Sequence, residues 1–113
     1  MKQNRDVVLI AHILDAISEI ESFVKNTTYP EFFKDTMKRA AVVRNLEIVG
    51  EAASKISKEF QKKNSTIPWS DIVGMRNKLI HDYFDVDYGI VWEVVQSDLN
   101  VFKKGLKPKK TKT

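Results

Sequence analysis

Residues 41–60 read AVVRNLEIVGEAASKISKEF, and this stretch has the most regular hydrophobic pattern in the 113-residue chain. Its apolar positions recur at alternating steps of four and three: Val42, Leu46, Val49, Ala53, Ile56 and Phe60. A 3.5-residue repeat is typical of a helix that packs along its length in a left-handed bundle. The pattern predicts one helix over about residues 36–63. Gly50 interrupts it at a cost of about 1 kcal/mol relative to alanine, which indicates close approach of a neighbouring backbone.

The flanking segments predict more helices of the same bundle. Val7, Ile10, Leu14, Ile17 and Val24 share one face of a helix over about residues 5–25. Further helices are expected at Tyr29–Phe33, over about 69–81, and from an Asp87 N-cap to a stop at Gly105. No stretch shows sustained strand alternation. The fold class predicted is all-α, an up-and-down bundle of four to five helices.

Composition predicts one helical domain over residues 1–103 and a lysine-rich flexible tail over 104–113. Six of the 19 basic residues lie from Lys103 onward, where there is no acid. The tail is either a solvated end or a weak, salt-sensitive contact to phosphate. There is no cysteine, which excludes disulfides and thiolate metal sites. The apolar run 7–17 is too short to cross a membrane, so we expect a cytoplasmic protein without a membrane segment.

The chemistry of the chain is concentrated between Arg76 and Tyr83. This segment reads RNKLIHDY and brings together a guanidinium, an amide, an imidazole, a carboxylate and a phenol. The imidazole of His81 exchanges protons near neutral pH, and the guanidinium of Arg76 holds phosphate oxygens while staying charged. Such a pair suffices for RNA cleavage without a metal, because the ribose 2′-hydroxyl serves as the nucleophile. The segment is therefore a candidate ribonuclease site.

The spacing of Arg76 and His81 raises a geometric difficulty. Five residues along an ideal helix leave two side chains about 140° apart, so they cannot share a face. Either the helix ends at His81, or two chains share one cleft across a two-fold axis. In a purely structural interpretation, Arg76 is a surface ion-pair partner and His81 is a helix-end residue that binds carbonyls. The residues alone leave these alternatives open.

The pattern Arg-x4-His-x-Tyr formed by Arg76, His81 and Tyr83 resembles the signature of the HEPN superfamily, and more closely that of HepT toxins from HepT–MntA toxin–antitoxin pairs. Residues 41–52, the two stretches Ile67–Trp69 and Ile72–Asn77, and Val91, Trp92 and Leu99 resemble other parts of the same family. The resemblance covers about residues 5–103. The lysine tail lies outside it.

The resemblance implies a homodimeric or larger HEPN-like assembly that cleaves RNA, with Arg76 and His81 as catalytic residues and no metal or cofactor. Asn77 is given a supporting, orienting role. The implied partner is a cognate MntA-like nucleotidyltransferase antitoxin, which transfers AMP from ATP to Tyr83. An adenylylated phenol would place bulk and negative charge beside the guanidinium and the imidazole.

Other candidate residues have simpler interpretations. Glu47 and Glu51 lie one turn apart, but an ion pair such as Glu51 with Lys55 is the favoured interpretation. Trp69 and Trp92 could stack bases, although core or dimer-interface packing is the more common role. His12 is interpreted as a helix-flank or interface residue.

Two further functions stay open on the sequence alone. The chain could be a non-catalytic HEPN binding module that forms a complex with a minimal nucleotidyltransferase, since fold does not determine function. Alternatively, the nucleotidyltransferase could be the harmful component and this chain its substrate or restraint.

Overall fold

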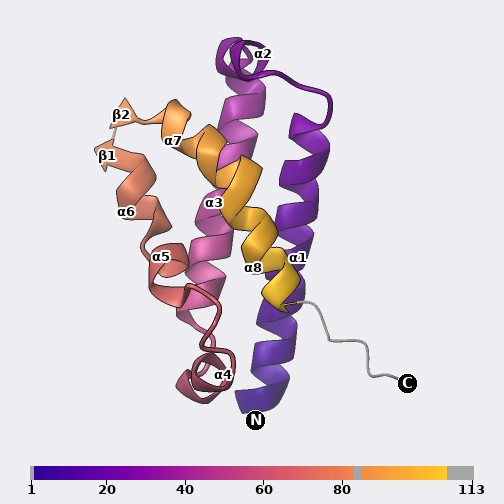
Figure 1. Cartoon of the computed structure of the whole chain (residues 1–113), viewed down its shortest axis with the longest axis vertical. Helices are drawn as coiled ribbons and strands as arrows, with labels where there is room; N and C mark the ends of the chain where they lie inside the picture. The colour runs from indigo at the N-terminus through magenta and orange to yellow at the C-terminus, as the bar shows by residue number, and fades with distance from the viewer. Residues whose placement is uncertain (1, 83–84, 107–113) are drawn as a thin grey trace.

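The computed structural model of the chain describes residues 2–82 and 85–106 (Figure 1), and the side chains of residues 2–4, 76 and 79–82 lie outside that description. The described elements are, in chain order, α1 (Lys2–Val24), α2 (Tyr29–Lys34), α3 (Thr36–Ser54), α4 (Lys58–Lys63), α5 (Trp69–Val73), α6 (Met75–Leu79), β1 (Ile80–Asp82), β2 (Asp85–Val86), α7 (Tyr88–Glu93), the π-helical turn η1 (Val94–Asp98) and α8 (Leu99–Leu106).

The helices form antiparallel columns, which are α1, α3, the pair α5–α6 and the run α7–η1–α8 (Figure 1). α1 and α3 pack along their lengths, α5 and α6 pack against α3, and the continuous run α7–η1–α8 crosses in front of α3 to reach α1. The short helices α2 and α4 lie at opposite ends of the bundle. The prediction of an all-α, up-and-down bundle is therefore confirmed.

The apolar repeat of residues 41–60 faces the core, as its spacing predicts. Five of its six apolar positions are buried, and Phe60 packs against the same core. They meet the inner face of α1, and Phe102 closes the core from α8. The largest fully buried side chains are Phe32, Phe102, Ile13, Ile17, Ile20, Leu46, Val42, Val49 and Val91.

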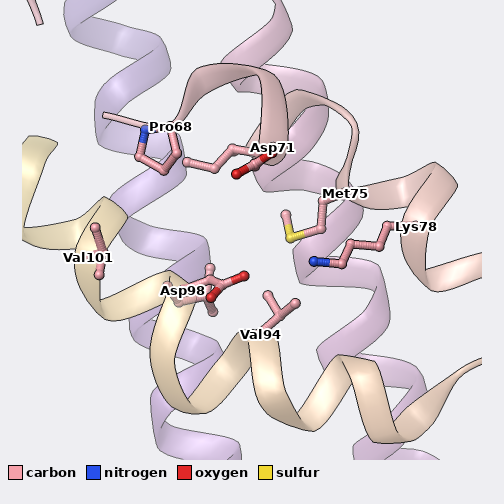
Figure 2. A pocket seen from close by; sticks show the side chains of 9 residues that line it. Pro68, Asp71, Met75, Lys78, Val94, Asp98 and Val101 are labelled. Atoms are coloured by element: carbon pink, nitrogen blue, oxygen red, sulfur yellow. The ribbon is translucent and has the colours of Figure 1, made fainter. Parts of the chain in front are cut away.

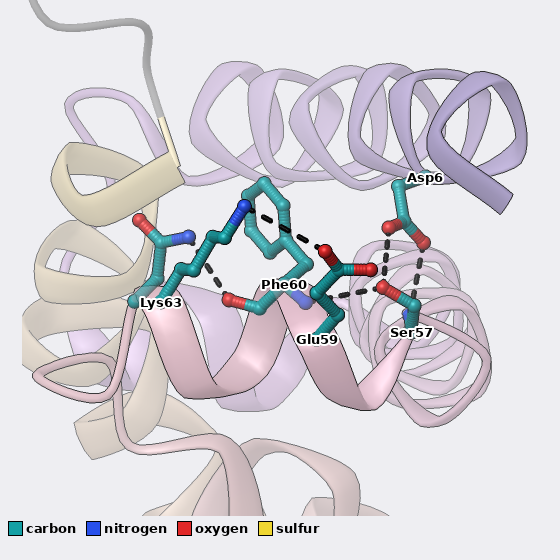
Figure 3. A network of polar contacts seen from close by, with 6 residues as sticks. Asp6, Ser57, Glu59, Phe60 and Lys63 are labelled. Atoms are coloured by element: carbon teal, nitrogen blue, oxygen red, sulfur yellow. Dashed lines mark hydrogen bonds and ion pairs between the residues drawn. The ribbon is translucent and has the colours of Figure 1, made fainter.

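The single helix predicted over 36–63 is wrong, because α3 ends at Ser54 and α4 begins at Lys58. The break is stabilised by Asp6 of α1, which is only 5% exposed (Figure 3). Its carboxylate accepts hydrogen bonds from the Ser57 backbone N–H at 2.9 Å and the Ser57 hydroxyl at 2.6 Å. The same Ser57 hydroxyl accepts the Phe60 N–H at 3.1 Å and caps α4. This buried acid therefore anchors the start of α4 on α1.

Other helix ends follow the sequence closely. α2 begins with a capping box in which Thr28 and Glu31 bind each other's backbone N–H groups, and Pro30 lies in its first turn. The carboxylate of Asp87 accepts the Ile90 N–H at 3.1 Å, which confirms the predicted N-cap of α7. α8 is described through Leu106, so the helix continues past the predicted stop at Gly105.

A two-stranded antiparallel hairpin joins α6 to α7, and the sequence did not predict it. β1 and β2 pair Ile80 with Val86 and Asp82 with Asp85, with an irregularity between the two pairs. Strands of three and two residues are too short to produce a visible alternation. The hairpin ends the α5–α6 column and starts the α7–α8 column.

The proposed division between domain and tail stays a prediction. α8 continues through Lys104, and Leu106 is buried against the core. Lys103 bonds to both carboxylate oxygens of Glu21 at 3.0 Å and so ties α8 to α1. Residues 107–113 lie outside the described part of the chain.

The buried carboxylate of α1 provides a stability test. We expect Asp6→Ala to lower the free energy of unfolding by about 1–3 kcal/mol, because it removes the acceptor of both Ser57 donors, the backbone N–H and the hydroxyl. Chemical denaturation followed by circular dichroism measures the change. The exposed Asp15 on the same helix supplies the matched variant Asp15→Ala, for which a change within about 0.5 kcal/mol is expected. Equal losses in the two variants would contradict the anchoring role of Asp6.

Candidate functional site

The candidate catalytic segment spans the end of one column and the start of the hairpin. Arg76 is the second residue of α6, and His81 is the middle residue of β1. Asn77 lies in the first turn of α6 and is exposed. The side chains of Arg76 and His81, and the whole of Tyr83, lie outside the described residues. The structure therefore places the backbone of the predicted catalytic pair.

The helix predicted over 69–81 is wrong at two points. It is interrupted at Gly74, and it ends at Leu79. At the interruption the Gly74 N–H donates to Ser70 O at 2.9 Å, and a Cβ added to Gly74 would lie 3.1 Å from that same oxygen. A side chain would crowd the carbonyl, so glycine suits this turn.

The end of α6 at Leu79 changes the expected angle between the side chains of Arg76 and His81. The 140° separation of Arg76 and His81 holds only if both residues belong to one straight helix. Here the chain leaves the helix two residues before His81 and continues as a strand. Of the two hypotheses, an early helix end agrees with the structure, although the end falls at Leu79 rather than at His81. The helical constraint on the pair is thereby removed.

The position of α6 depends on how α5 packs against α3. A Cβ added to Gly50 of α3 would lie 3.4 Å from Ile72 O and 3.8 Å from Val73 O, so the two backbones approach closely there. This confirms the predicted reason for a glycine inside α3. Ile72 and Met75 are both buried, and Arg76 follows Met75 directly. The core therefore holds the chain on both sides of Gly74.

A pocket of about 160 Å³ opens beside this segment, between α5–α6 and η1–α8 (Figure 2). Ile72, Met75, Val94 and Leu99 supply apolar walls. Three charged side chains, Asp71, Lys78 and Asp98, also line it. This lining suits a small apolar group with a polar end.

Nothing in the sequence pointed to this pocket. The π-helical turn η1 contributes Val94 and Asp98 to its wall, and π turns are frequent at functional sites. A π turn has no sequence signature comparable to a cap or a glycine, so only the structure reveals it.

The polar residues of the α1–α3 face form ion pairs. Lys55 lies 3.3 Å from Glu51, and Arg44 lies 4.0 Å from Glu47. The pairing of Glu51 with Lys55 confirms the prediction for that residue. His12 is exposed on this face, where a shallow groove of about 410 Å³ runs between the two helices. In the described part of the chain, no three histidine, aspartate or glutamate residues could together hold a metal ion.

Both tryptophans pack against aromatic residues of the bundle. Trp69 is buried, contacts Phe60 and Phe102 edge-to-face at 6.0 and 5.7 Å, and donates its indole N–H to Asn64 O at 3.0 Å. Trp92 is partly buried against Phe32, with ring centroids 5.2 Å apart. Trp69 is thus a core residue.

A family model described as Ribonuclease HepT-like matches residues 13–108, a range that includes the whole Arg-x4-His-x-Tyr signature. The chain belongs to the HepT-like ribonuclease family. The family resemblance inferred from the sequence is therefore confirmed. Within the described residues, no helix combines the length and the apolar character that a membrane crossing needs.

Individual relatives of this HepT-like chain cover most of its length. A protein of Caldanaerobacter subterraneus subsp. tengcongensis, named "Putative RNase", is 42% identical over 98 residues, which are 87% of this chain and 88% of the relative. A Methanocaldococcus jannaschii protein of the same name is 42% identical over 101 residues, 88% of this chain and 93% of the relative. "Probable ribonuclease HepT" of Thermococcus cleftensis is 40% identical over 91 residues, 80% and 83% of the two chains. No solved structure gives a significant match.

The contact between α3 and α5 can be tested at Gly50 in this HepT-like chain. A methyl group fits at 3.4 Å, so we expect Gly50→Ala to leave stability unchanged or to raise it by up to about 1 kcal/mol through helix propensity. We expect Gly50→Leu to lower it by about 1–3 kcal/mol, since the larger side chain must push α5 away. Thermal and urea unfolding measure both variants. A leucine variant as stable as the alanine variant would show that α5 does not press on α3.

Proposed function

We propose that this chain is the toxin component of a type VII-like toxin–antitoxin pair and a metal-independent endoribonuclease, with Arg76 and His81 as its catalytic residues. The observation that carries the proposal is the HepT-like match, which spans the Arg-x4-His-x-Tyr signature and nearly the whole bundle. The early end of α6 supports it, because the chain is no longer helical where His81 lies.

In the proposed reaction, the His81 imidazole accepts the proton of a ribose 2′-hydroxyl. The freed oxygen attacks the adjacent phosphorus, and the bond to the 5′-oxygen of the next nucleotide breaks. A proton from water neutralises that leaving oxygen, so the products carry a 2′,3′-cyclic phosphate and a 5′-hydroxyl. The Arg76 guanidinium neutralises charge that builds on the phosphorus oxygens. Asn77, exposed one residue further on, orients the substrate or the arginine.

A homodimer completes the proposed site. One bundle of this size presents a single helix–hairpin segment, whereas a two-fold axis would bring two such segments to one cleft. RNA would then lie between the two copies and contact both. We place this assembly in the cytoplasm, where its RNA substrate is found.

The proposed control is covalent. A cognate MntA-like nucleotidyltransferase binds ATP, the phenol oxygen of Tyr83 attacks the α-phosphorus, and pyrophosphate leaves. The resulting phosphodiester adds a negative charge two residues from His81, where it competes with the RNA phosphate for Arg76.

Substitution of the catalytic pair tests the nuclease assignment. We expect Arg76→Ala and His81→Ala each to reduce cleavage of a labelled RNA at least about 100-fold, because each removes a group that acts on the transition state. Gel assays measure the rate, and circular dichroism checks that the fold persists. The exposed residues Arg5 and His12 provide matched variants, Arg5→Ala and His12→Ala, which should retain activity. Cleavage at the wild-type rate by both catalytic variants would overturn the assignment.

Intact mass tests the proposed control. The chain produced together with its neighbouring nucleotidyltransferase should gain one or more AMP units, all located at Tyr83 by fragmentation. Tyr83→Phe should abolish the gain, whereas Tyr88→Phe, five residues further along, should not affect it. An unmodified Tyr83 in the presence of active partner and ATP would contradict this part of the proposal.

A further inference from the structure

An aromatic face lies on the outer side of α2 and α7. The rings of Tyr29 and Phe33 are 5.9 Å apart, and Phe33 meets Tyr88 edge-to-face at 6.3 Å. Tyr29 also contacts Trp92 at 5.9 Å, which joins this face to the core. Phe33 remains 47% exposed. The rings of this face contact one another, and Phe33 is open to solvent.

Arg39 of α3 underlies the same rings. Its guanidinium carbon lies 4.3 Å from the centroid of Tyr88 and 5.2 Å from that of Phe33, both within cation–π range. The Nε atom is buried without a hydrogen-bond partner, and no ion pair of Arg39 is found among the described residues. The positive charge of Arg39 is therefore not neutralised by a described carboxylate.

A shallow hollow of about 270 Å³ lies on this face, lined by Tyr29, Pro30, Phe33 and Lys34. Two aromatic rings and a proline ring supply flat apolar surface, and the lysine supplies a second cation at the edge. Flat rings beside cations are the chemistry with which proteins bind unpaired nucleotides: the rings stack on bases and the cations attract phosphates.

The two acids of this segment, Glu31 and Asp35, accept hydrogen bonds from backbone N–H groups at the helix ends. The Glu31 carboxylate accepts the Thr28 N–H at 2.9 Å, and this hydrogen bond holds the pKa of Glu31 below its ordinary value. The Asp35 carboxylate accepts the Lys38 N–H at 2.9 Å at the start of α3. No acid lines the hollow. The face therefore presents Lys34 and Arg39 as its cations.

We propose that the aromatic face formed by Tyr29, Phe33, Tyr88, Lys34 and Arg39 binds an unpaired nucleotide of the RNA substrate, with the base stacked against Phe33 and the phosphate near Lys34. The inference rests on the proposed ribonuclease function and extends it to the substrate class: single-stranded RNA rather than a duplex, whose paired bases are already stacked.

The location of the aromatic face supports this assignment. Tyr88 begins α7 two residues after β2 ends, so the α7 part of the face directly follows the hairpin that carries His81. An RNA strand that passes the hairpin can reach the face without crossing the bundle. A second copy of the chain fits the face less well, because a two-fold contact there would bring two sets of Lys34 and Arg39 into one interface.

Binding of a fluorescent single-stranded RNA, followed by anisotropy in a His81→Ala background that prevents cleavage, tests the inference. We expect Phe33→Leu, which keeps an apolar side chain but removes the ring, to weaken binding at least about fivefold. We expect Lys34→Ala to weaken binding about two- to fivefold and to reduce its salt dependence. Lys62→Ala is the matched control: Lys62, like Lys34, is exposed in the last turn of a six-residue helix, but at the opposite end of the bundle. It should bind within about twofold of the parent.

The outcomes separate the two proposals. If Phe33→Leu binds RNA as its parent does while Arg76→Ala abolishes cleavage, the aromatic face is not a subsite and the nuclease proposal stands. If Phe33→Leu changes the oligomeric state in sedimentation, the face is a protein contact and the inference is overturned. If the wild-type chain neither binds nor cuts RNA, both proposals fail. Ultraviolet crosslinking of a 4-thiouridine RNA to Tyr29 or Phe33 would support the subsite directly.

Discussion

The close packing of α5 on α3, which leaves room at Gly50 for no more than a methyl group, is the constraint on which the rest of the arrangement depends. The carbonyl groups of Ile72 and Val73 approach α3 to distances at which one methyl group would just be in contact. α5 is therefore positioned by backbone contact, which is less adaptable than contact between flexible side chains. Because Met75 is buried directly after the Gly74 turn, this position is passed on to α6 and to the hairpin beyond it.

Two long-range contacts hold the α4 end of the bundle, which is also the end of α3 that carries Gly50. Asp6 of α1 accepts hydrogen bonds from Ser57, the N-cap of α4, 51 residues later, and Trp69 ties the loop after α4 to the core by donating to Asn64 O. These hydrogen bonds lie at the α4 end of the bundle. The aromatic face of α2 and α7 lies at the opposite end, and the hairpin of the candidate nuclease segment leads into α7. A rigid scaffold of this kind is what a small site needs, because catalytic groups must be held to within a fraction of an ångström.

Much of this fold could be predicted because the chain is locally consistent. The 3.5-residue repeat identified the buried face of α3, and cap residues such as Asp87 and Pro30 marked helix starts. The break before α4 could not be predicted, since Ile56 keeps the period through it and its cause is a contact with the distant Asp6. The hairpin was missed because its strands are too short to alternate.

Part of the candidate site could likewise be predicted from the sequence, and part could not. The resemblance to HepT toxins identified Arg76, His81 and Tyr83 as candidate site residues. Their residue types alone left purely structural roles open. The aromatic face was not visible, because Phe33, Arg39 and Tyr88 come from three elements and no spacing links them. The apolar pocket beside α6 depends on a π turn that no pattern announces.

The central claim is that a guanidinium and an imidazole cleave RNA through its own 2′-hydroxyl. Mass spectrometry of the RNA fragments, produced by the purified chain in the presence of a chelator, tests this claim most directly. Cleavage is expected under these conditions, with a 2′,3′-cyclic phosphate on one fragment and a 5′-hydroxyl on the next. Cleavage that requires an added divalent metal and leaves a 3′-hydroxyl and a 5′-phosphate would contradict it.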